Sequence, residues 1–289
     1  MNAQSAVKQY PRMTLVCDYI NQNLDAELSI EQLSGVAALS KYHFHRLFSA
    51  FTGVSVVRFI QLMRLKRASF RLVFEQELRI IDIAYEAGFD SPEAFSRAFK
   101  RTFGQSPRSF RASPEWPEWH SKFQFDMPAG GVLKMNVEIV NFVETPVARV
   151  EHKGPREQVL ETVGRFVAWR KATGLSPVNT SKTFGVPYND PNTCVPEAFR
   201  FDVCGSFDGE VPANAYGVKS GVIPGGRCAV IHHRGSHDKI DECIYYLYRN
   251  WLPGSGEELR DYPCFFQYLN FIHEVDECDL LTDIYLPLK

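Results

Sequence analysis

Residues 40–53 read Ser-Lys-Tyr-His-Phe-His-Arg-Leu-Phe-Ser-Ala-Phe-Thr-Gly, and residues 91–104 read Ser-Pro-Glu-Ala-Phe-Ser-Arg-Ala-Phe-Lys-Arg-Thr-Phe-Gly. At an offset of 51 positions the two stretches share a serine, two phenylalanines, an arginine and a glycine, as Ser40/Ser91, Phe44/Phe95, Arg46/Arg97, Phe48/Phe99 and Gly53/Gly104. The same offset pairs upstream residues, Ile30 with Ile81, Leu33 with Ala84 and Ala38 with Phe89. The first part of the chain is therefore a duplicated structural unit.

Each copy predicts two helices joined by a tight turn. The second helix begins after a serine N-cap, carries phenylalanines at i and i+4, and ends at a glycine C-cap. A polar face on the second helix of a helix-turn-helix is the face that enters a DNA major groove. Nine residues form this face and are candidate DNA contacts: Lys41, Tyr42, His45 and Arg46 in the first copy, and Pro92, Glu93, Ser96, Arg97 and Lys100 in the second.

Two stretches around the second copy carry a family resemblance, Asp82-Ile83-Ala84-Tyr85-Glu86-Ala87-Gly88-Phe89 and Gly104-Gln105-Ser106-Pro107-Arg108-Ser109-Phe110-Arg111. With the duplication they make the chain resemble the AraC/XylS family of bacterial transcription regulators. The resemblance implies a DNA-binding domain with two helix-turn-helix units, double-stranded DNA and RNA polymerase as partners, and a place on the bacterial nucleoid in the cytoplasm. The alternative is a plain helical bundle with solvated charges.

The distribution of charge favours a nucleic-acid partner for the first part. The net charge is −2, but residues 1–115 carry +4 and the remainder carries −6. Two runs contain no acidic residue, from Gln32 to Phe74 and from Phe95 to Ser113, and both are rich in Lys and Arg. Because phosphate binding needs clustered cations, these runs predict a phosphate-binding footprint.

Length and composition indicate about two globular domains in 289 residues. No apolar run approaches the roughly 20 residues of a membrane span, and the N-terminal residues lack a signal-segment pattern. The seven cysteines are scattered, with no Cys-x-x-Cys pair and no zinc spacing. We therefore expect buried thiols in a reducing cytoplasm and no membrane partner.

The expected domains are residues 1–113, a linker or packed connecting segment at 114–133, and residues 134–289. Periodicity predicts helices at 11–24, 29–38, 40–52, 54–74, 79–87, 91–103 and 107–111 in the first domain. In the last domain it predicts helices at 155–173 and 236–251 and strands near 137–143, 146–152, 182–188, 199–207, 216–222, 227–233, 263–272 and 281–288.

The last domain also repeats, at an offset of 81 positions. The matches include Ala148/Ala229, His152/His233, Gly154/Gly235, Val159/Ile240 and Val163/Ile244. Each copy predicts a strand, a glycine turn and an amphipathic helix, and two copies would form an α+β domain with a groove at a pseudo-twofold axis. This pattern resembles the GyrI-like effector-binding domain, and the domain order resembles the Rob subgroup. The expected fold is thus multidomain, an all-α double helix-turn-helix followed by an α+β GyrI-like domain with a pseudo-twofold repeat.

A groove between two packed halves is a common ligand site, and six aromatic residues are candidates to line it: Trp169, Tyr188, Tyr245, Trp251, Phe266 and Tyr268. Each of them is also a candidate core residue. The GyrI-like resemblance implies an acid in the strand that contains Tyr268, but Phe266 occupies that position. We therefore expect a neutral or weakly polar aromatic or amphiphilic ligand rather than a cation.

Catalytic and metal motifs do not emerge from the sequence. His232, His233 and His237 are close in sequence, but adjacent residues of a strand point to opposite faces. We expect no metal, no cofactor and no enzymatic activity. Two alternatives stay open, a second domain that binds only a protein partner, and a GyrI-like hydrolase or toxin-binding protein carried on a DNA-binding domain. The duplicated recognition helix predicts a monomer on DNA.

Overall fold

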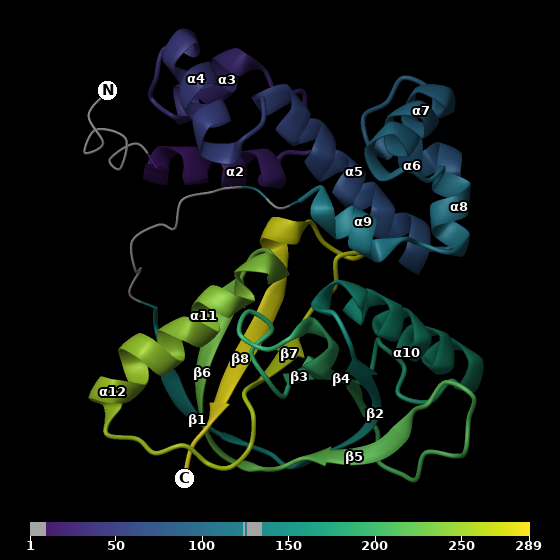
Figure 1. Cartoon of the computed structure of the whole chain (residues 1–289), viewed down its shortest axis with the longest axis vertical. Coiled ribbons are helices and arrows are strands. Elements are labelled where there is room, and N and C mark those ends of the chain that lie inside the picture. The colour runs from purple at the N-terminus through teal and green to yellow at the C-terminus, as the bar shows by residue number, and fades with distance from the viewer. Residues whose placement is uncertain (1–9, 124, 126–134) are drawn as a thin grey trace. The chain divides into compact units, whose positions relative to one another are not determined.

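The computed structural model describes residues 10–123, 125 and 135–289, and the chain divides into two compact units (Figure 1). The first unit comprises Met1–Leu133 and Ile272–Asp279, and the second comprises Lys134–Phe271 and Leu280–Lys289. Residues 272–279 are therefore separated in sequence from the rest of the unit to which they belong.

The first unit is all-helical in its described part. Its helices are α2 (Tyr10–Gln22), α3 (Ile30–Val36), α4 (Lys41–Thr52), α5 (Val56–Phe74), α6 (Ile80–Glu86), α7 (Pro92–Phe103), α8 (Pro107–Ala112) and α9 (Trp116–Ser121). The seven helices predicted for this part are present, and α9 is additional. Taken singly, none of the described helices is long and apolar enough to cross a membrane; the bent pair His43–Thr52 and Val56–Phe74, at 48°, meets those criteria only jointly.

The caps of α4 and α7 repeat as predicted. Ser40 accepts a hydrogen bond from a backbone N–H at the start of α4, and Ser91 does the same for α7. Gly53 and Gly104 end the two helices with φ of 77° and 75°. These values lie in the left-handed region, where only glycine carries no Cβ penalty. The phenylalanine stripes Phe44/Phe48 and Phe95/Phe99 are fully buried.

The offset of 51 fails for the first helix of each helix-turn-helix copy. Helices α3 and α6 begin at Ile30 and Ile80, so their offset is 50, and the fully buried Leu33 matches the buried Ile83 rather than Ala84. The reason is length, since five residues separate α6 from α7 whereas four separate α3 from α4. The upstream pairs predicted from the sequence are therefore shifted by one residue.

Helix α9 lies in the segment expected to connect the domains. Trp116 and Trp119 are 1% and 2% exposed. Trp116 packs on Phe110 at 5.2 Å and Trp119 on Phe70 at 5.0 Å between ring centroids. The tryptophan pair thus anchors residues 116–121 in the first unit. Most of the rest of the 114–133 segment, from residue 126 onward, lies outside the described residues.

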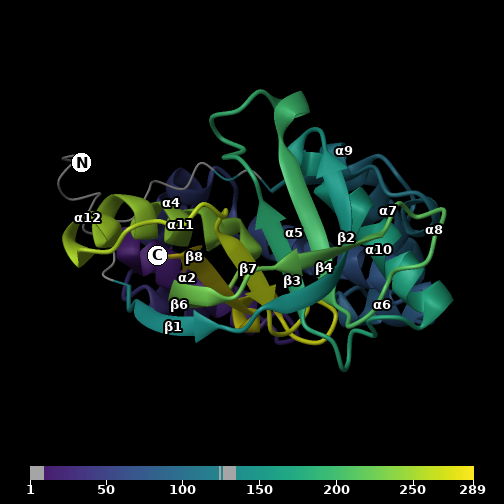
Figure 2. The same cartoon turned by 90° about the horizontal axis from the view of Figure 1, so that it is seen from below.

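The second unit is an eight-stranded antiparallel sheet with the order β1-β6-β8-β7-β3-β4-β2-β5. Figure 2 shows the sheet from below, with β1 and β6 side by side on the left. The strands are β1 (Glu138–Phe142), β2 (Thr145–Lys153), β3 (Thr183–Pro187), β4 (Arg200–Ser206), β5 (Lys219–Ile223), β6 (Gly226–Arg234), β7 (Phe265–Tyr268) and β8 (Leu281–Pro287). Helix α10 spans Val159–Thr173, and α11 (Ile240–Tyr246) continues through a π-helical turn, Leu247–Trp251, into α12 (Leu252–Ser255).

The internal repeat is confirmed and extends further than the sequence matches. An offset of 81 carries the bounds of β1, β2 and β4 onto those of β5, β6 and β8. Exchanging each strand for its counterpart reverses the strand order onto itself, which is the property of a pseudo-twofold axis. The axis passes between β3 and β7, where Gly185 pairs with its own counterpart Phe266.

The two faces of the sheet have separate apolar clusters. The cluster under α10 and α11 includes Phe166 of α10 and Phe201 and Phe266 of the sheet. The other face includes Phe142 and Phe265, whose ring centroids are 4.9 Å apart. Alternate residues of every strand therefore belong to different environments.

Candidate functional site

The first recognition helix, α4, presents part of its predicted polar face to solvent. Lys41 and Arg46 are exposed and His45 is half-buried, whereas the side chain of Tyr42 lies outside the described part. Lys41 forms an ion pair with Glu31 of α3, with side chains 59% and 62% exposed. Since exposed ion pairs contribute only about 0–1 kcal/mol, this pair leaves Lys41 able to exchange its partner for a phosphate.

The second recognition helix, α7, presents the equivalent face. Glu93, Arg97 and Lys100 are exposed, and Pro92 and Ser96 are half-buried. Arg97 occupies on α7 the position that Arg46 occupies on α4. The structure thus gives each copy an exposed arginine on the face opposite its buried phenylalanines.

Three arginines from the acid-free runs form hydrogen bonds inside the first unit, so they have structural partners there. Arg58 donates to the hydroxyl of Thr102 in α7 at 3.3 Å. Arg64 donates to the Leu24 and Ala26 carbonyls, both at 2.8 Å, and Arg111 donates to those of Leu72 and Leu78 at 3.1 and 2.8 Å. Burial lowers the pKa of all three guanidinium groups.

Three further cations of α5 are paired with acids. Lys66 contacts Glu277 at 2.7 Å, Arg67 binds Asp25 and also contacts Asp276 at 2.8 Å, and Arg71 contacts Glu75 and Glu86. The hydrogen bond from Arg67 lowers the pKa of the Asp25 carboxyl. The phosphate-binding interpretation of the run from Gln32 to Phe74 is therefore wrong for α5, because its cations hold the unit together. In the second run Arg97, Lys100, Arg101 and Arg108 are exposed.

Phe266 lies at the pseudo-twofold axis, on the face under α10 and α11. It is 6% exposed, and its ring lies 6.4 Å from those of Phe201 and Tyr268. A side chain at Gly185 would meet Phe201 at 2.5 Å and the Tyr268 hydroxyl at 2.8 Å, so only glycine fits there. The centre of this face is thus apolar and aromatic, with Phe266 at the position where the sequence lacks the expected acid.

Two more of the predicted aromatic residues belong near this face. Trp251 packs against the apolar cluster under the helices, as Tyr268 does. The hydroxyl of Tyr245 on α11 donates to Asp190 at 2.9 Å and accepts from Asn192 at 3.0 Å. The β3–β4 loop of the first copy therefore holds a side chain of the second copy's helix.

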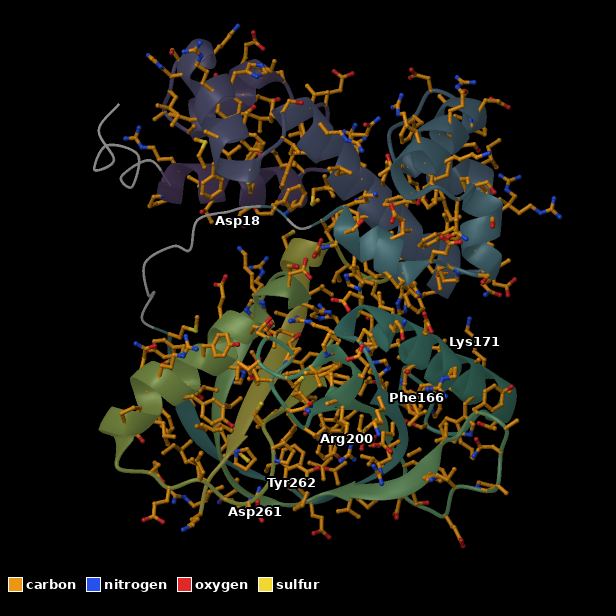
Figure 3. The ribbon with its side chains drawn as sticks, viewed as in Figure 1. Asp18, Phe166, Lys171, Arg200, Asp261 and Tyr262 are labelled. Carbon is orange, nitrogen blue, oxygen red and sulfur yellow. The ribbon has the colours of Figure 1, made fainter. Side chains whose placement is uncertain are left out.

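The remaining two aromatic residues differ in position, because Trp169 of α10 belongs to the same apolar cluster as Phe266 and Tyr188 does not. Trp169 is fully buried and stacks on Phe166, labelled in Figure 3, at 5.4 Å. Tyr188 follows β3 on the other face of the sheet, where its hydroxyl donates to Asp202 at 2.9 Å. The structure makes Trp169 a core residue and gives Tyr188 a structural hydrogen bond away from Phe266.

Asp202 is a buried acid that sequence reasoning missed. It is 1% exposed, Arg149 contacts its Oδ2 at 2.6 Å, and its Oδ1 has no hydrogen-bond partner among the described residues. Burial, followed by the bond to Asp202, raises the pKa of the Tyr188 hydroxyl. The counterpart at offset 81 is Asp283, which pairs with His232 Nδ1 at 2.6 Å. The offset was the signal that could have revealed this acid, since both copies place an aspartate at the same strand position.

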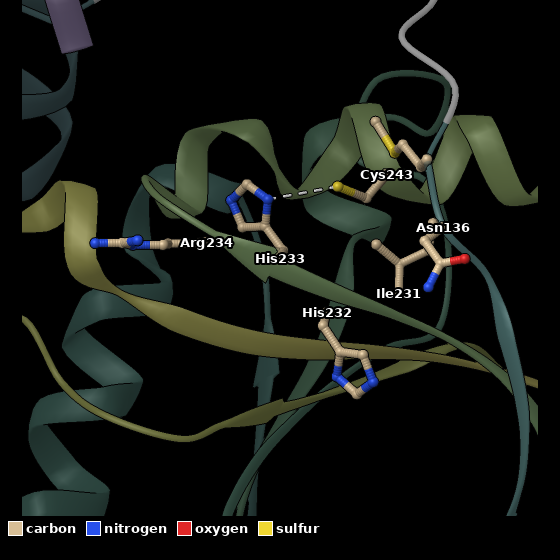
Figure 4. Close-up of a pocket in the computed structure, with 7 residues that line it drawn as sticks. Asn136, Ile231, His232, His233, Arg234 and Cys243 are labelled. Atoms are coloured by element: carbon tan, nitrogen blue, oxygen red, sulfur yellow. Dashed lines mark hydrogen bonds between the residues drawn. The ribbon is translucent and has the colours of Figure 1, made fainter.

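A cavity of about 260 Å³ lies beside β6 and is lined by Met135, Asn136, Ile231, His232, His233, Arg234 and Cys243 (Figure 4). Cys243 Sγ lies 3.6 Å from His233 Nδ1, and His233 Nε2 lies 3.0 Å from the Ser236 carbonyl. The ring therefore donates through Nε2 and accepts from the thiol. Burial raises the pKa of the Cys243 thiol to about 11, so the pair does not form an activated nucleophile.

The first copy contains the same arrangement with a hydroxyl. His152 Nδ1 lies 3.0 Å from the hydroxyl of Thr162, and its Nε2 contacts the Gly154 and Pro155 carbonyls at 3.2 Å. Thr162 and Cys243 are related by the offset of 81, as His152 and His233 are. The histidine thus fastens strand, turn and helix in each copy, which is a structural role.

The histidines near β6 do not converge on a metal site. Figure 4 shows His232 and His233 on opposite sides of β6, as expected for neighbours in a strand. Across the described ranges, no group of three or more His, Cys, Asp or Glu side chains has the arrangement to hold a metal ion.

Comparisons with known proteins match both units. The family described as "GyrI-like small molecule binding domain" matches residues 135–289, and "Helix-turn-helix domain" matches residues 33–113. The chain is similar to "Probable transcriptional regulator YgiV" of Escherichia coli (strain K12), with 47% identity over 156 residues, 54% of this chain and 98% of that protein. It is also similar to "Right origin-binding protein" of the same strain, with 37% identity over 180 residues, 60% of this chain and 61% of that protein.

Solved structures give a more distant likeness. The structure titled "Crystal structure of EcmrR C-terminal domain" matches with a TM-score of 0.46 and 17% identity, over 54% of this chain and 99% of that one.

Proposed function

We propose that this chain, which belongs to the GyrI-like family of small molecule binding domains through residues 135–289, is a sequence-specific transcription regulator controlled by a small ligand. The helix-turn-helix match at residues 33–113 confirms the expected order of the two parts. A relative matched over 98% of its own length is named a probable transcriptional regulator, which supports the proposal.

The main support for the proposal is that the recognition helix is duplicated, as α4 and α7, and that the connector helix α5 links the two copies. Helices α4 and α7 have matching caps and matching exposed arginines, and the uninterrupted α5 joins the two helix-turn-helix motifs. A monomer of this design places its recognition helices in successive major grooves about 34 Å apart. We propose an asymmetric site of roughly 20 bp, bound by a monomer.

Selection of duplexes from a random pool with the full chain, followed by footprinting, tests this proposal. We expect one asymmetric protected stretch and a single chain per duplex. A palindromic footprint that requires two chains would refute the monomer geometry, and failure to enrich any sequence would refute sequence-specific binding.

Arg46 is the residue we propose as base reader on α4, because arginine binds guanine through two hydrogen bonds. Arg46→Ala should lower affinity for the selected duplex by about 1–3 kcal/mol and relax preference at one base pair. Lys100→Ala should weaken all sequences alike and reduce the salt slope by about one unit. Equal weakening of selected and random duplexes by Arg46→Ala would contradict base reading.

For the ligand we propose a neutral or weakly polar aromatic or amphiphilic compound, bound near Phe266 and Tyr268. The apolar surroundings of Phe266 support this class, since burying a cation costs free energy unless a carboxylate pairs with it. A thermal-shift screen of the full chain should find neutral aromatics that raise the melting temperature. A quaternary ammonium dye that binds tightly, with affinity unchanged by Phe266→Leu, would contradict it.

We propose RNA polymerase as a further partner and the bacterial nucleoid as the place of action, both because the proposed output is transcription. The competing function is a hydrolase of small reactive compounds. Such an enzyme needs an activated nucleophile or acid, and burial keeps Cys243 protonated by raising the pKa of its thiol to about 11. Turnover of activated esters by the full chain would favour the enzyme over the regulator.

A further inference from the structure

The segment Ile272–Asp279 follows β7 and precedes β8 in sequence, yet it belongs to the first unit. The residues on either side of it belong to the second unit. At the base of this loop, Leu269 N–H donates to the Leu281 carbonyl at 2.9 Å, and Leu281 N–H donates to Asn270 Oδ1 at 2.7 Å. The loop therefore leaves the sheet between two fixed points.

Inside the first unit the segment is bound to α5 by two ion pairs. Glu277 Oε1 contacts Lys66 Nζ at 2.7 Å, and these side chains are 16% and 7% exposed. Asp276 Oδ1 contacts Arg67 Nη1 at 2.8 Å, with side chains 26% and 15% exposed. Cys278 Sγ also lies 3.6 Å from the Asn21 carbonyl of α2. Because both ion pairs are largely withdrawn from water, they hold the segment more firmly than surface pairs would.

The counterpart of this segment in the first copy has different partners. The offset of 81 carries residues 191–198 onto 272–279, and both contain a short 3₁₀ helix near their end. The first copy has Val195 and Pro196 where the second has Asp276 and Glu277. Residues 191–198 lie in the second unit. The acidic pair is thus specific to the copy whose loop joins the first unit.

The segment starts close to the proposed ligand site. Tyr268, the last residue of β7, lies four positions before Ile272. Its ring is 5.1 Å from that of His237 and 6.4 Å from that of Phe266. A ligand that displaces Tyr268 would therefore move the strand from which the loop departs.

We propose that residues 272–279 form a transmission arm that couples occupancy of the ligand site to the connector helix α5. Asp276 and Glu277 bind α5 through ion pairs with Arg67 and Lys66. Helix α5 in turn fixes the relative placement of the two recognition helices. This inference rests on the proposed function, because it names the route by which that ligand site would regulate DNA binding.

Hydrogen exchange on the full chain tests the arm without DNA and without a ligand. Tyr268→Leu perturbs the end of β7, and exchange rates of α5 amides are the readout. We expect a change of about fivefold in the parent chain, the lower end of typical coupling between sites. Replacing residues 272–279 by Pro-Asn-Thr-Cys-Val-Pro-Glu-Ala, the sequence of 191–198, should reduce the effect of Tyr268→Leu to less than about twofold.

A charge exchange separates loss of coupling from loss of folding. Lys66→Glu alone should abolish the response of α5, and the double variant Lys66→Glu/Glu277→Lys should restore it. Glu197→Gln, at an exposed position of the corresponding loop in the first copy, is the matched control and should leave the response unchanged. Rescue by the double variant would show that the ion pair, rather than either side chain alone, carries the response.

Two results would overturn the arm: no response of α5 to Tyr268→Leu in the parent chain, or an unchanged response in the loop replacement. Failure of the proposed function has a different signature. If no duplex is enriched by the full chain, regulation of DNA binding is refuted, while the exchange experiment still decides whether the arm couples Tyr268 to α5.

Discussion

Arg64 should stabilise the first unit, although its place in a basic run suggested phosphate binding. Its guanidinium donates to the carbonyls of Leu24 and Ala26, both at 2.8 Å, and it fills the space where a side chain at Gly88 would lie. Hydrogen bonds from a charged donor contribute about 1.5–3 kcal/mol each. Since one of the two acceptors is exposed, we expect Arg64→Ala to cost about 2–4 kcal/mol in unfolding free energy.

Urea unfolding of the full chain, followed by helical circular dichroism, measures this cost. With an m value near 2 kcal/mol/M, the transition of the first unit should shift by about 1–2 M. Arg64→Lys should recover less than half, because an ammonium cannot serve both carbonyls in the fixed geometry of a guanidinium. Arg108→Ala, at an exposed position of α8, is the matched control and should leave the midpoint unchanged. If Arg64→Ala instead lowers DNA affinity at unchanged stability, the structural assignment of this arginine is wrong.

Three further predictions concern the second unit. Arg149→Met should cost about 3 kcal/mol in urea unfolding, because Asp202 would stay buried without its cation. Cys243→Thr should change stability by less than about 1 kcal/mol at pH 7, since Thr162 fills the same role in the first copy. The pKa of the Cys243 thiol is raised to about 11, so its contribution is full below about pH 9 and is lost as pH rises through 11. Unfolding free energies across that range should therefore fall more steeply for the parent than for the Cys243→Thr variant. Gly185→Ala should cost about 1–3 kcal/mol, because the added methyl meets two buried rings, and normal stability by calorimetry would contradict this packing.

Local signals in the sequence predicted most of the architecture. Serine caps, glycine stops and phenylalanine spacing are properties of single helices, so α4 and α7 begin and end where Ser40, Gly53, Ser91 and Gly104 indicate. The offset of 81 predicted two equivalent halves, and the sheet has that symmetry.

Properties that depend on distant neighbours were not predictable in this way. The sequence does not show whether a basic residue of a helix is exposed or donates to a backbone carbonyl of the same unit. The structural role of Arg64 therefore could not be told in advance from the exposed position of Arg46. Trp169 and Tyr268 are both aromatic residues in amphipathic segments, and only packing makes the first fully buried. Burial of Asp202 likewise depends on Arg149, which is 53 positions away.

In both parts of the chain the two copies share the residues that build the fold, and they differ at the residues proposed to bind DNA or the ligand. A pseudo-symmetric core needs equal packing in its two halves. In each copy a strand histidine therefore contacts a side chain of the following helix, His152 with Thr162 and His233 with Cys243. A ligand at the axis and a single arm cannot obey that symmetry. Gly185 opposite Phe266 makes the axis one-sided, because a second ring there would collide with Tyr268 and Phe201.

The same logic applies to the two recognition helices. Lys41 and Tyr42 of the first copy correspond to Pro92 and Glu93 of the second, so the two helices present different chemistry to DNA while sharing an arginine. A duplex read by such a pair must itself be asymmetric. The positions at which the two copies differ therefore indicate which residues distinguish one end of a DNA site from the other end. The same comparison indicates which residues distinguish the two faces of a ligand site.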